Sequence, residues 1–243
     1  MRKKHRETDM EYYYVPNLND DIVTLSQEEA RHCVRVIRHV AGDAIVMVDG
    51  KGLWARGTIL ATTKDRCQVQ VDERKIVENH RVLSLHIAVS PTKNRERVEW
   101  FVEKAVEVGI EKITFLLCDH SERLRVDMQR MERIAISAMK QSQSATIPEM
   151  DVLAFDALIQ GMRNWEGDKM IAWCDADDNS VELADKDLLK NDVLLLIGPE
   201  GDFSKREIEL AKSENFTEVR LGPKRLRTET AAIYGCCVIN SKG

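Results

Sequence analysis

The chain has 243 residues, of which 43% are hydrophobic and 32% charged, a composition typical of one large or two small folded domains. No apolar run is longer than that of residues 193–197, so no membrane-spanning helix is expected. A formal net charge of −5 argues against a protein that coats nucleic acid through bulk charge, but it leaves room for a local basic patch.

The cysteines and the start of the chain point to a reducing compartment. The six cysteines form no C-x-x-C pair and no zinc-ligand pattern with the histidines. The basic start MRKKHRETDM is followed by EYYYVPNLND rather than by an apolar signal core. We therefore expect a cytoplasmic protein with free thiols and no structural metal.

The first third of the chain predicts a small β-barrel that carries one helix. Ser26 and Glu29 have the spacing of a capping box at the start of a helix over 26–40. Short β-type runs follow at 44–49, 53–60 and 66–71, and the Gly-Lys-Gly between the first two is typical of a hairpin loop. We expect the barrel to occupy residues from about 10 to 72, and 73–82 to be a charged linker.

From residue 83 onward, strand-like and helical segments alternate, which predicts an α/β layer with a parallel sheet. The expected strands are 83–90, 112–118, 170–174, 193–197 and 218–222. The expected helices are 95–109, 127–142, a segment that begins after a capping box of Ser204 and Glu207, and 228–240. In such a sheet the ligand crevice lies beyond the carboxyl ends of the strands.

Two Gly-Pro loops stand at predicted carboxyl ends of strands: residues 197–204 read IGPEGDFS, and residues 221–230 read LGPKRLRTET. Neither loop is a phosphate-binding P-loop or a G-x-G-x-x-G fingerprint. Glycines in the first loop would let backbone approach a ligand closely. The second loop adds a lysine and two arginines beside it, an arrangement that suits an uncharged heterocycle next to a polyanion.

The segments IGPEGDFSKREIE and LGPKRLRTETAA resemble the signature of the 16S ribosomal RNA uracil-N3 methyltransferases, the RsmE-type branch of the SPOUT superfamily. Upstream, RHCVRVIRHVAGDAIVMVDGKG is similar to the family's PUA-like barrel, and KNRERVEWFVEKAVEVGIEKI and SERLR to its following segments. The resemblance implies an α/β fold with an N-terminal PUA-like RNA-binding barrel over 1–74. It also implies a SPOUT methyltransferase domain with a parallel sheet and a deep trefoil knot over 75–243, and a homodimer.

The resemblance further implies methylation of N3 of one uridine in 16S rRNA, either free or in the assembled small subunit, with S-adenosylmethionine as donor. Arg227 is the expected catalytic cation, since a guanidinium can stabilise negative charge on the uracil oxygens. Glu229 and Glu200 are candidate proton acceptors, although either could instead pair structurally with an arginine. The donor pocket is expected to be lined by Trp173, Ile197, Gly198, Pro199, Glu200, Gly201, Leu221, Gly222, Leu226 and Thr228.

Candidate RNA contacts are basic side chains in both predicted domains. Arg31, Arg35 and Arg38 recur at steps of four and three and would share one helix face. Such a stripe is typical of a solvated surface, but on a PUA-like domain it would equally suit phosphate. The remaining candidates are Lys93, Arg123 and Arg225, with Arg95 and Arg97 of the same kind.

The sequence departs from the family pattern at three places. Asp202 replaces the last glycine of GPEGG, and residues 140–145 read KQSQSA where the family has EQSGR and hence an arginine. Nine residues also precede Met10, where such proteins commonly begin, so they are either an added RNA-contacting arm or lie upstream of the natural start.

Three other functions compete with this one. A different SPOUT chemistry, such as ribose 2′-O-methylation or methylation of a tRNA purine, would use the same fold. An RNA-binding or ribosome-assembly protein without activity would not bind the donor. A small-molecule nucleotide enzyme is disfavoured because both phosphate-binding fingerprints are missing.

Overall fold

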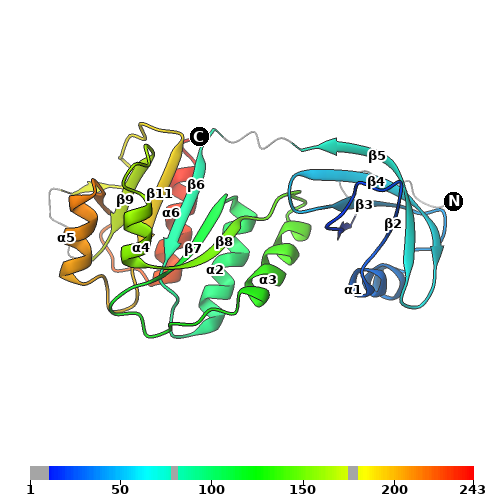
Figure 1. Cartoon of the computed structure of the whole chain (residues 1–243), viewed down its shortest axis with the longest axis horizontal. Helices are drawn as coiled ribbons and strands as arrows, with labels where there is room; N and C mark the ends of the chain where they lie inside the picture. The colour runs from blue at the N-terminus through cyan, green and yellow to red at the C-terminus, as the bar shows by residue number, and fades with distance from the viewer. Residues whose placement is uncertain (1–10, 78–81, 175–179) are drawn as a thin grey trace. The chain divides into compact units, whose positions relative to one another are not determined.

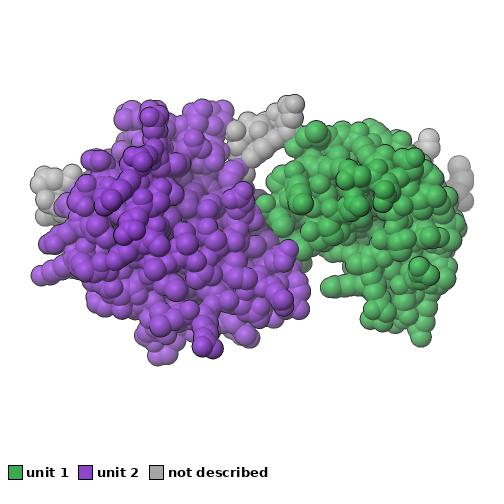
Figure 2. Space-filling view, viewed as in Figure 1, with its two compact units in different colours: residues 1–80, 136–147 green, residues 81–135, 148–243 purple. Residues whose placement is uncertain are grey.

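The computed structural model describes residues 11–77, 82–174 and 180–243, in two compact units (Figures 1 and 2). The first unit comprises residues 1–80 and 136–147, and the second comprises 81–135 and 148–243. The expected division after residue 74 differs from this arrangement, because residue 74 lies inside a strand and a middle segment of the chain belongs to the first unit. The possible N-terminal arm lies outside the described residues.

The first unit contains a five-stranded sheet whose strand order is β1-β3-β4-β5-β2. Its strands are β1 (Tyr12–Tyr14), β2 (Ile22–Thr24), β3 (Ala44–Val48), β4 (Leu53–Thr62) and β5 (Cys67–Ile76). The sheet curls around a core that includes Tyr13, Leu18, Ile45, Met47 and Ile59. The predicted hairpin is confirmed: β3 pairs antiparallel with β4, and the two glycines between them have φ angles of 77° and 103°. The predicted linker is wrong at its start, because residues 73–76 continue β5.

The helix of the first unit is shorter and less regular than its sequence predicts. It consists of α1 (Gln27–Arg31) and a π-helical segment, η2 (His32–Ile37). The Ser26 hydroxyl accepts a hydrogen bond from the Glu29 N–H at 3.2 Å. The reciprocal half of the capping box is not formed, because the buried Glu29 carboxylate pairs with Lys140. The segment ends at Arg38, whose φ of 65° is left-handed.

The second unit contains an all-parallel sheet of seven strands in the order β10-β12-β9-β11-β6-β7-β8. Its strands are β6 (Ser84–Val89), β7 (Lys112–Leu117), β8 (Glu149–Ala154), β9 (Asp168–Ala172), β10 (Val181–Glu182), β11 (Asp192–Ile197) and β12 (Thr217–Arg220). Its helices are α2 (Arg95–Val108), α4 (Phe155–Gly161), α5 (Lys205–Ser213) and α6 (Thr228–Asn240), together with the first half of α3 (Met128–Gln141), whose residues from 136 onward belong to the first unit. The parallel α/β architecture is therefore confirmed, whereas the trefoil knot stays a prediction.

Helices cover both faces of this sheet, as Figure 1 shows. Leu194 and Leu196 of β11 belong to the cluster packed under α4 and α5. The residue between them, Leu195, lies against Gly235 of α6, where an added Cβ would come within 2.5 Å of its side chain. Because alternate residues of β11 are buried on opposite faces, all of its residues after Asp192 are apolar.

The strand order places the carboxyl ends of β12, β9 and β11 side by side at one edge of the sheet. The two Gly-Pro loops of the sequence follow β11 and β12 directly. The fold thus brings together two loops that are separated in the chain by α5 and β12. Across the described residues, no helix combines the length and apolar character needed to cross a membrane.

A buried histidine in the second unit makes its stability depend on pH. The ring of His86 is within 2.8 Å of the Thr114 hydroxyl, which donates to Asp151. Burial, reinforced by nearby Lys112 and opposed by Asp151, lowers the pKa of His86 from 6.5 to about 4. The unfolded chain therefore binds a proton that the folded chain does not bind between these two values, so stability is complete above pH 6.5 and falls as the pH drops toward 4.

We expect His86→Gln to weaken this pH dependence, because glutamine can still donate to Thr114 but does not titrate. In wild type, lowering the pH from 7.5 to 5 should cost about 2 kcal/mol of unfolding free energy through His86. Urea unfolding followed by tryptophan fluorescence reports the second unit when wild type and variant both carry Trp54→Phe, because Trp54 lies in the first unit and Trp100, Trp165 and Trp173 lie in the second. An identical pH dependence in the variant would show that another group is responsible.

Candidate functional site

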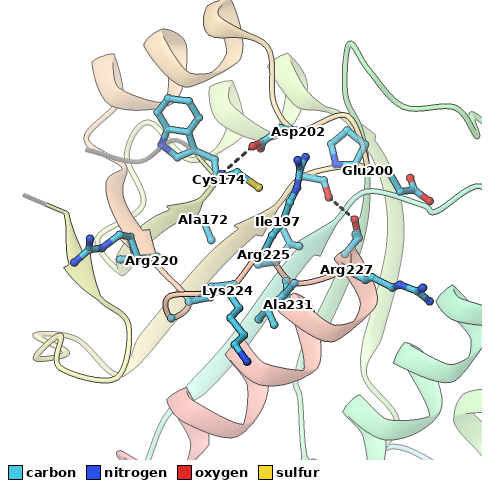
Figure 3. Close-up of a pocket in the computed structure, with 18 of the residues that line it drawn as sticks. Ala172, Cys174, Ile197, Glu200, Asp202, Arg220, Lys224, Arg225, Arg227 and Ala231 are labelled. Atoms are coloured by element: carbon cyan, nitrogen blue, oxygen red, sulfur yellow. Dashed lines mark hydrogen bonds between the residues drawn. The ribbon is translucent and has the colours of Figure 1, made fainter. Parts of the chain in front are cut away.

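A cavity of about 430 Å³ opens at the carboxyl ends of β9, β11 and β12 (Figure 3). Its size is within the range of roughly 300–1,000 Å³ typical of small-molecule sites. Nine of the ten residues predicted to form the donor pocket line it, and Gly201 does not. The sequence analysis missed seven other lining residues, which are Ala172, Cys174, Asp202, Val219, Arg220, Pro223 and Ala231. The cations of the last loop, Lys224, Arg225 and Arg227, which it placed beside the ligand, also line the cavity.

The glycines of the first loop serve internal packing. A Cβ added to Gly198 would lie 3.0 Å from the Phe203 ring, and one added to Gly201 would lie 3.3 Å from the Cβ of His120. The expectation that these glycines let the backbone approach a ligand stays a prediction, and the structure adds that an extra Cβ at either position would meet protein atoms. Gly198 contributes to the cavity through its position, which is fixed by a 3.1 Å hydrogen bond from the Thr228 hydroxyl to its carbonyl oxygen.

The first loop is a tight turn held at both ends. The Asp202 N–H donates to the Pro199 carbonyl at 2.9 Å, and helix α5 begins with the predicted capping box of Ser204 and Glu207. Glu207 is fully buried, and its second oxygen accepts a 2.9 Å hydrogen bond from the Asp119 N–H after β7. The start of α5 is thereby fixed to the neighbouring loop.

The second loop is anchored by a residue that the sequence analysis overlooked. Glu182 of β10 accepts a 2.9 Å hydrogen bond from the Gly222 N–H and lies 3.4 Å from Arg220 Nε. Gly222 has a φ of 108°, a conformation that favours glycine. No pattern signals a two-residue strand such as β10, so only the folded chain shows this anchor.

Four cations and two acids line the cavity: Arg220, Lys224, Arg225 and Arg227, with Glu200 and Asp202. Arg227 occupies the N-cap position of α6, but its side chain makes no capping bond. In Figure 3 this side chain extends away from the other sticks. Arg225, predicted as an RNA contact, also lines the cavity.

The two candidate proton acceptors have different surroundings. Glu200 lines the cavity, and its carboxylate accepts a 3.0 Å hydrogen bond from the Lys93 N–H. Glu229 is only 9% exposed, is not among the lining residues, and lies 3.6 Å from Arg97 Nε of α2. This geometry matches the structural alternative for Glu229, an acid paired with an arginine.

The predicted RNA contacts Lys93 and Arg123 of the second unit have defined partners. Lys93 Nζ pairs with Glu122 at 2.9 Å. Arg123 donates to the carbonyl oxygens of Thr92 and Lys93 at 3.2 and 2.9 Å, so its guanidinium supports the loop that presents Lys93.

In the first unit, Arg31 and Arg35 lie 2.9 and 2.7 Å from one carboxylate oxygen of Asp65, which shows that they share a face. Arg38 follows the π-helical segment in a left-handed conformation, so the predicted three-residue step from Arg35 is not helical. Within residues 140–145, where the family arginine is missing, Lys140 pairs with Glu29.

Comparison with protein-family models identifies both parts of the chain. Residues 59–240 match the RNA methyltransferase domain, and residues 25–72 match the RNA methyltransferase PUA domain. The chain belongs to the RNA methyltransferase family. The predicted resemblance to the RsmE-type branch is confirmed.

Relatives of this RNA methyltransferase extend over nearly its full length. It is 27% identical over 230 residues to ribosomal RNA small subunit methyltransferase E of Bacillus subtilis, with 89% of each chain covered. A probable rRNA methyltransferase from Porphyromonas gingivalis is 38% identical, with a TM-score of 0.89 and 96% and 98% coverage of the two chains. A methyltransferase E from Neisseria gonorrhoeae, solved bound to S-adenosylmethionine, is 25% identical, with a TM-score of 0.83 and 96% and 97% coverage.

Proposed function

We propose that this RNA methyltransferase transfers a methyl group from S-adenosylmethionine to N3 of one uridine in 16S ribosomal RNA. The main supporting observation is the cavity between the two Gly-Pro loops, with arginines beside it. Relatives named ribosomal RNA small subunit methyltransferase E support the substrate, and the S-adenosylmethionine bound to the Neisseria relative supports the donor.

The cavity suits this donor in shape and in chemistry. Ile197, Leu221 and Leu226 supply apolar walls for an adenine ring. The acid Glu200 suits the positive sulfonium and ammonium groups, and the neighbouring cations suit the carboxylate. When bound, S-adenosylmethionine supplies an electrophilic methyl group.

The chain's own residues then have to orient the uracil and favour loss of its N3 proton. We assign stabilisation of the resulting negative charge to Arg227 and contact with RNA to Arg225. Glu200 is the candidate acid that lines the cavity, so we assign proton acceptance to Glu200 or to water, and we assign to Glu229 the positioning of Arg97. The target base must leave its stack to reach the cavity.

Nucleoside mass spectrometry of small-subunit rRNA, from cells with and without the gene, tests the proposal. We expect loss of 3-methyluridine in the deletion and its restoration by the wild-type gene. Loss of a different methylated nucleoside would support the methyltransferase activity and contradict uridine N3 as its target. No change in any nucleoside would favour a binding protein without activity.

We further propose that the first unit contacts rRNA phosphates through Arg31 and Arg35, with Arg38 as a secondary contact. Lys93 and Arg123 are secondary contacts from the second unit. Replacing Arg31 and Arg35 together by alanine should weaken RNA binding and reduce the slope of log affinity against log salt by about 1.5–2. Fluorescence anisotropy over a salt series measures this slope. Asp65→Asn is the matched control: it removes the shared acid, and binding should not weaken. An unchanged slope in the double variant would contradict the assignment.

We propose that the protein acts as a homodimer in the cytoplasm, where ribosomal subunits are assembled. The small α6 residues that could have packed against a partner, Ala231, Ala232 and Cys236, are buried within the protomer. A partner would therefore have to contact another face. Light scattering after gel filtration, with an expected mass of twice 27.8 kDa, tests the dimer.

A further inference from the structure

Asp202 stands where the resembling family has glycine, and its backbone explains why glycine suits the position. Its φ is 64°, a left-handed conformation that glycine adopts freely and other residues adopt at a cost of about 1 kcal/mol or more. The backbone itself is held on both sides, because the Asp202 N–H donates to Pro199 and the carbonyl oxygen lies 3.0 Å from His120 Nδ1. A glycine here would keep these backbone bonds and relieve the strain.

The side chain of Asp202 makes two bonds that glycine cannot make. Oδ2 accepts a 2.8 Å hydrogen bond from the Cys174 N–H, and Oδ1 accepts a 2.9 Å bond from the Phe203 N–H. The first bond crosses from the turn after β11 to the chain after β9, as the dashed line in Figure 3 shows. Trp173, Cys174 and Asp202 all line the cavity, so this bond joins two of its walls.

We propose that Asp202 is a positioning residue for the methyl donor: its carboxylate fixes the Trp173–Cys174 wall against the GPEGD turn before the donor binds. The inference rests on the proposed donor and adds to it a role specific to this chain. A wall that is already ordered reduces the conformational entropy lost on binding. The role of the carboxylate thus explains why a strained aspartate stands at a position where glycine would be less strained.

The proposal predicts that donor affinity falls in Asp202→Gly by more than stability does. The melting temperature of the variant, measured without donor, should change little, because relief of the strained conformation offsets the loss of the two side-chain hydrogen bonds. Its Kd for S-adenosylmethionine, measured by calorimetry, should rise about tenfold, as expected for loss of one hydrogen bond to a charged group. The KM for the donor should rise similarly, with a smaller change in kcat.

Two further variants separate the positioning of the cavity wall from effects of the substitution on overall stability. Asp202→Asn keeps one acceptor oxygen and should recover part of the lost affinity. Asn215→Gly is the matched control, because Asn215 also has a φ of 64° but is exposed just after α5 and does not line the cavity. It should change the melting temperature only slightly and leave the Kd unchanged.

Hydrogen exchange without the donor provides an independent measurement. A peptide that contains Cys174 should exchange faster in Asp202→Gly than in wild type, because the N–H has lost its carboxylate acceptor. Equal donor affinity in wild type and Asp202→Gly would overturn the inference and leave the proposed function intact. No binding of S-adenosylmethionine by wild type would instead contradict the proposed function.

Discussion

Replacing Arg227 by alanine is expected to lower the rate of uridine methylation by about 10²–10³, the usual effect of removing one group that stabilises developing negative charge. Arg227 lines the cavity at the start of α6, and its side chain makes no capping bond, so the substitution should not disturb the helix. Donor affinity should therefore change little while kcat falls. Methyl transfer to small subunits that lack 3-methyluridine measures the rate, and calorimetry measures the affinity.

Two control variants sharpen this test. Arg227→Lys keeps the charge but not the planar guanidinium, and it should recover only part of the rate. Arg163→Ala removes an exposed arginine whose partner is Glu214, outside the cavity, and it should retain full activity. Methylation by Arg227→Ala at the wild-type rate would show that Arg227 does not act as the catalytic cation.

Replacing Glu207 by alanine should destabilise the second unit by about 3 kcal/mol, because two backbone N–H groups would lose a buried, charged acceptor. These are the N–H groups of Ser204, at 2.8 Å, and Asp119, at 2.9 Å. Loss of both bonds would free the start of α5 and the turn that precedes it. Chemical unfolding of the variant and the wild type at pH 7 measures the difference.

Glu207→Gln should lose less stability than Glu207→Ala, since an amide oxygen can still accept one of the two bonds. Glu209→Ala removes an exposed glutamate from the same helix and should change the unfolding free energy by less than about 0.5 kcal/mol. If Glu207→Ala and Glu209→Ala unfold at the same denaturant concentration, the buried bonds contribute little to stability.

Sequence analysis predicted much of the second unit because helix caps and apolar runs depend on residues that are close together in the sequence. Helix α2 begins after Asn94, which caps Glu96, and ends before Gly109, whose φ is 103°. The apolar run of β11 predicted a central strand, and the capping box predicted the start of α5. The family resemblance added the site, and nine of its ten expected donor-pocket residues line one cavity.

The features that sequence analysis missed depend on contacts between distant segments. The edge strand β8 reads EMDVLA, too polar to resemble the central strands, and β10 has only two residues. The role of Gly198 became visible only with Phe203 packed against it. The pattern over 26–40 predicted one α-helix because sequence periodicity did not reveal the change to π-helical geometry after Arg31.

The contribution of residues 136–147 to the first unit also constrains the order in which the protein can fold during synthesis. Thr146 forms β-bridges with Gly50 and Lys51, and Lys140 pairs with Glu29, so the N-terminal unit lacks these contacts when its own strands leave the ribosome. At about 5–20 residues per second, the missing segment follows several seconds later. The nascent N-terminal unit therefore stays incompletely assembled until residues 136–147 have been translated.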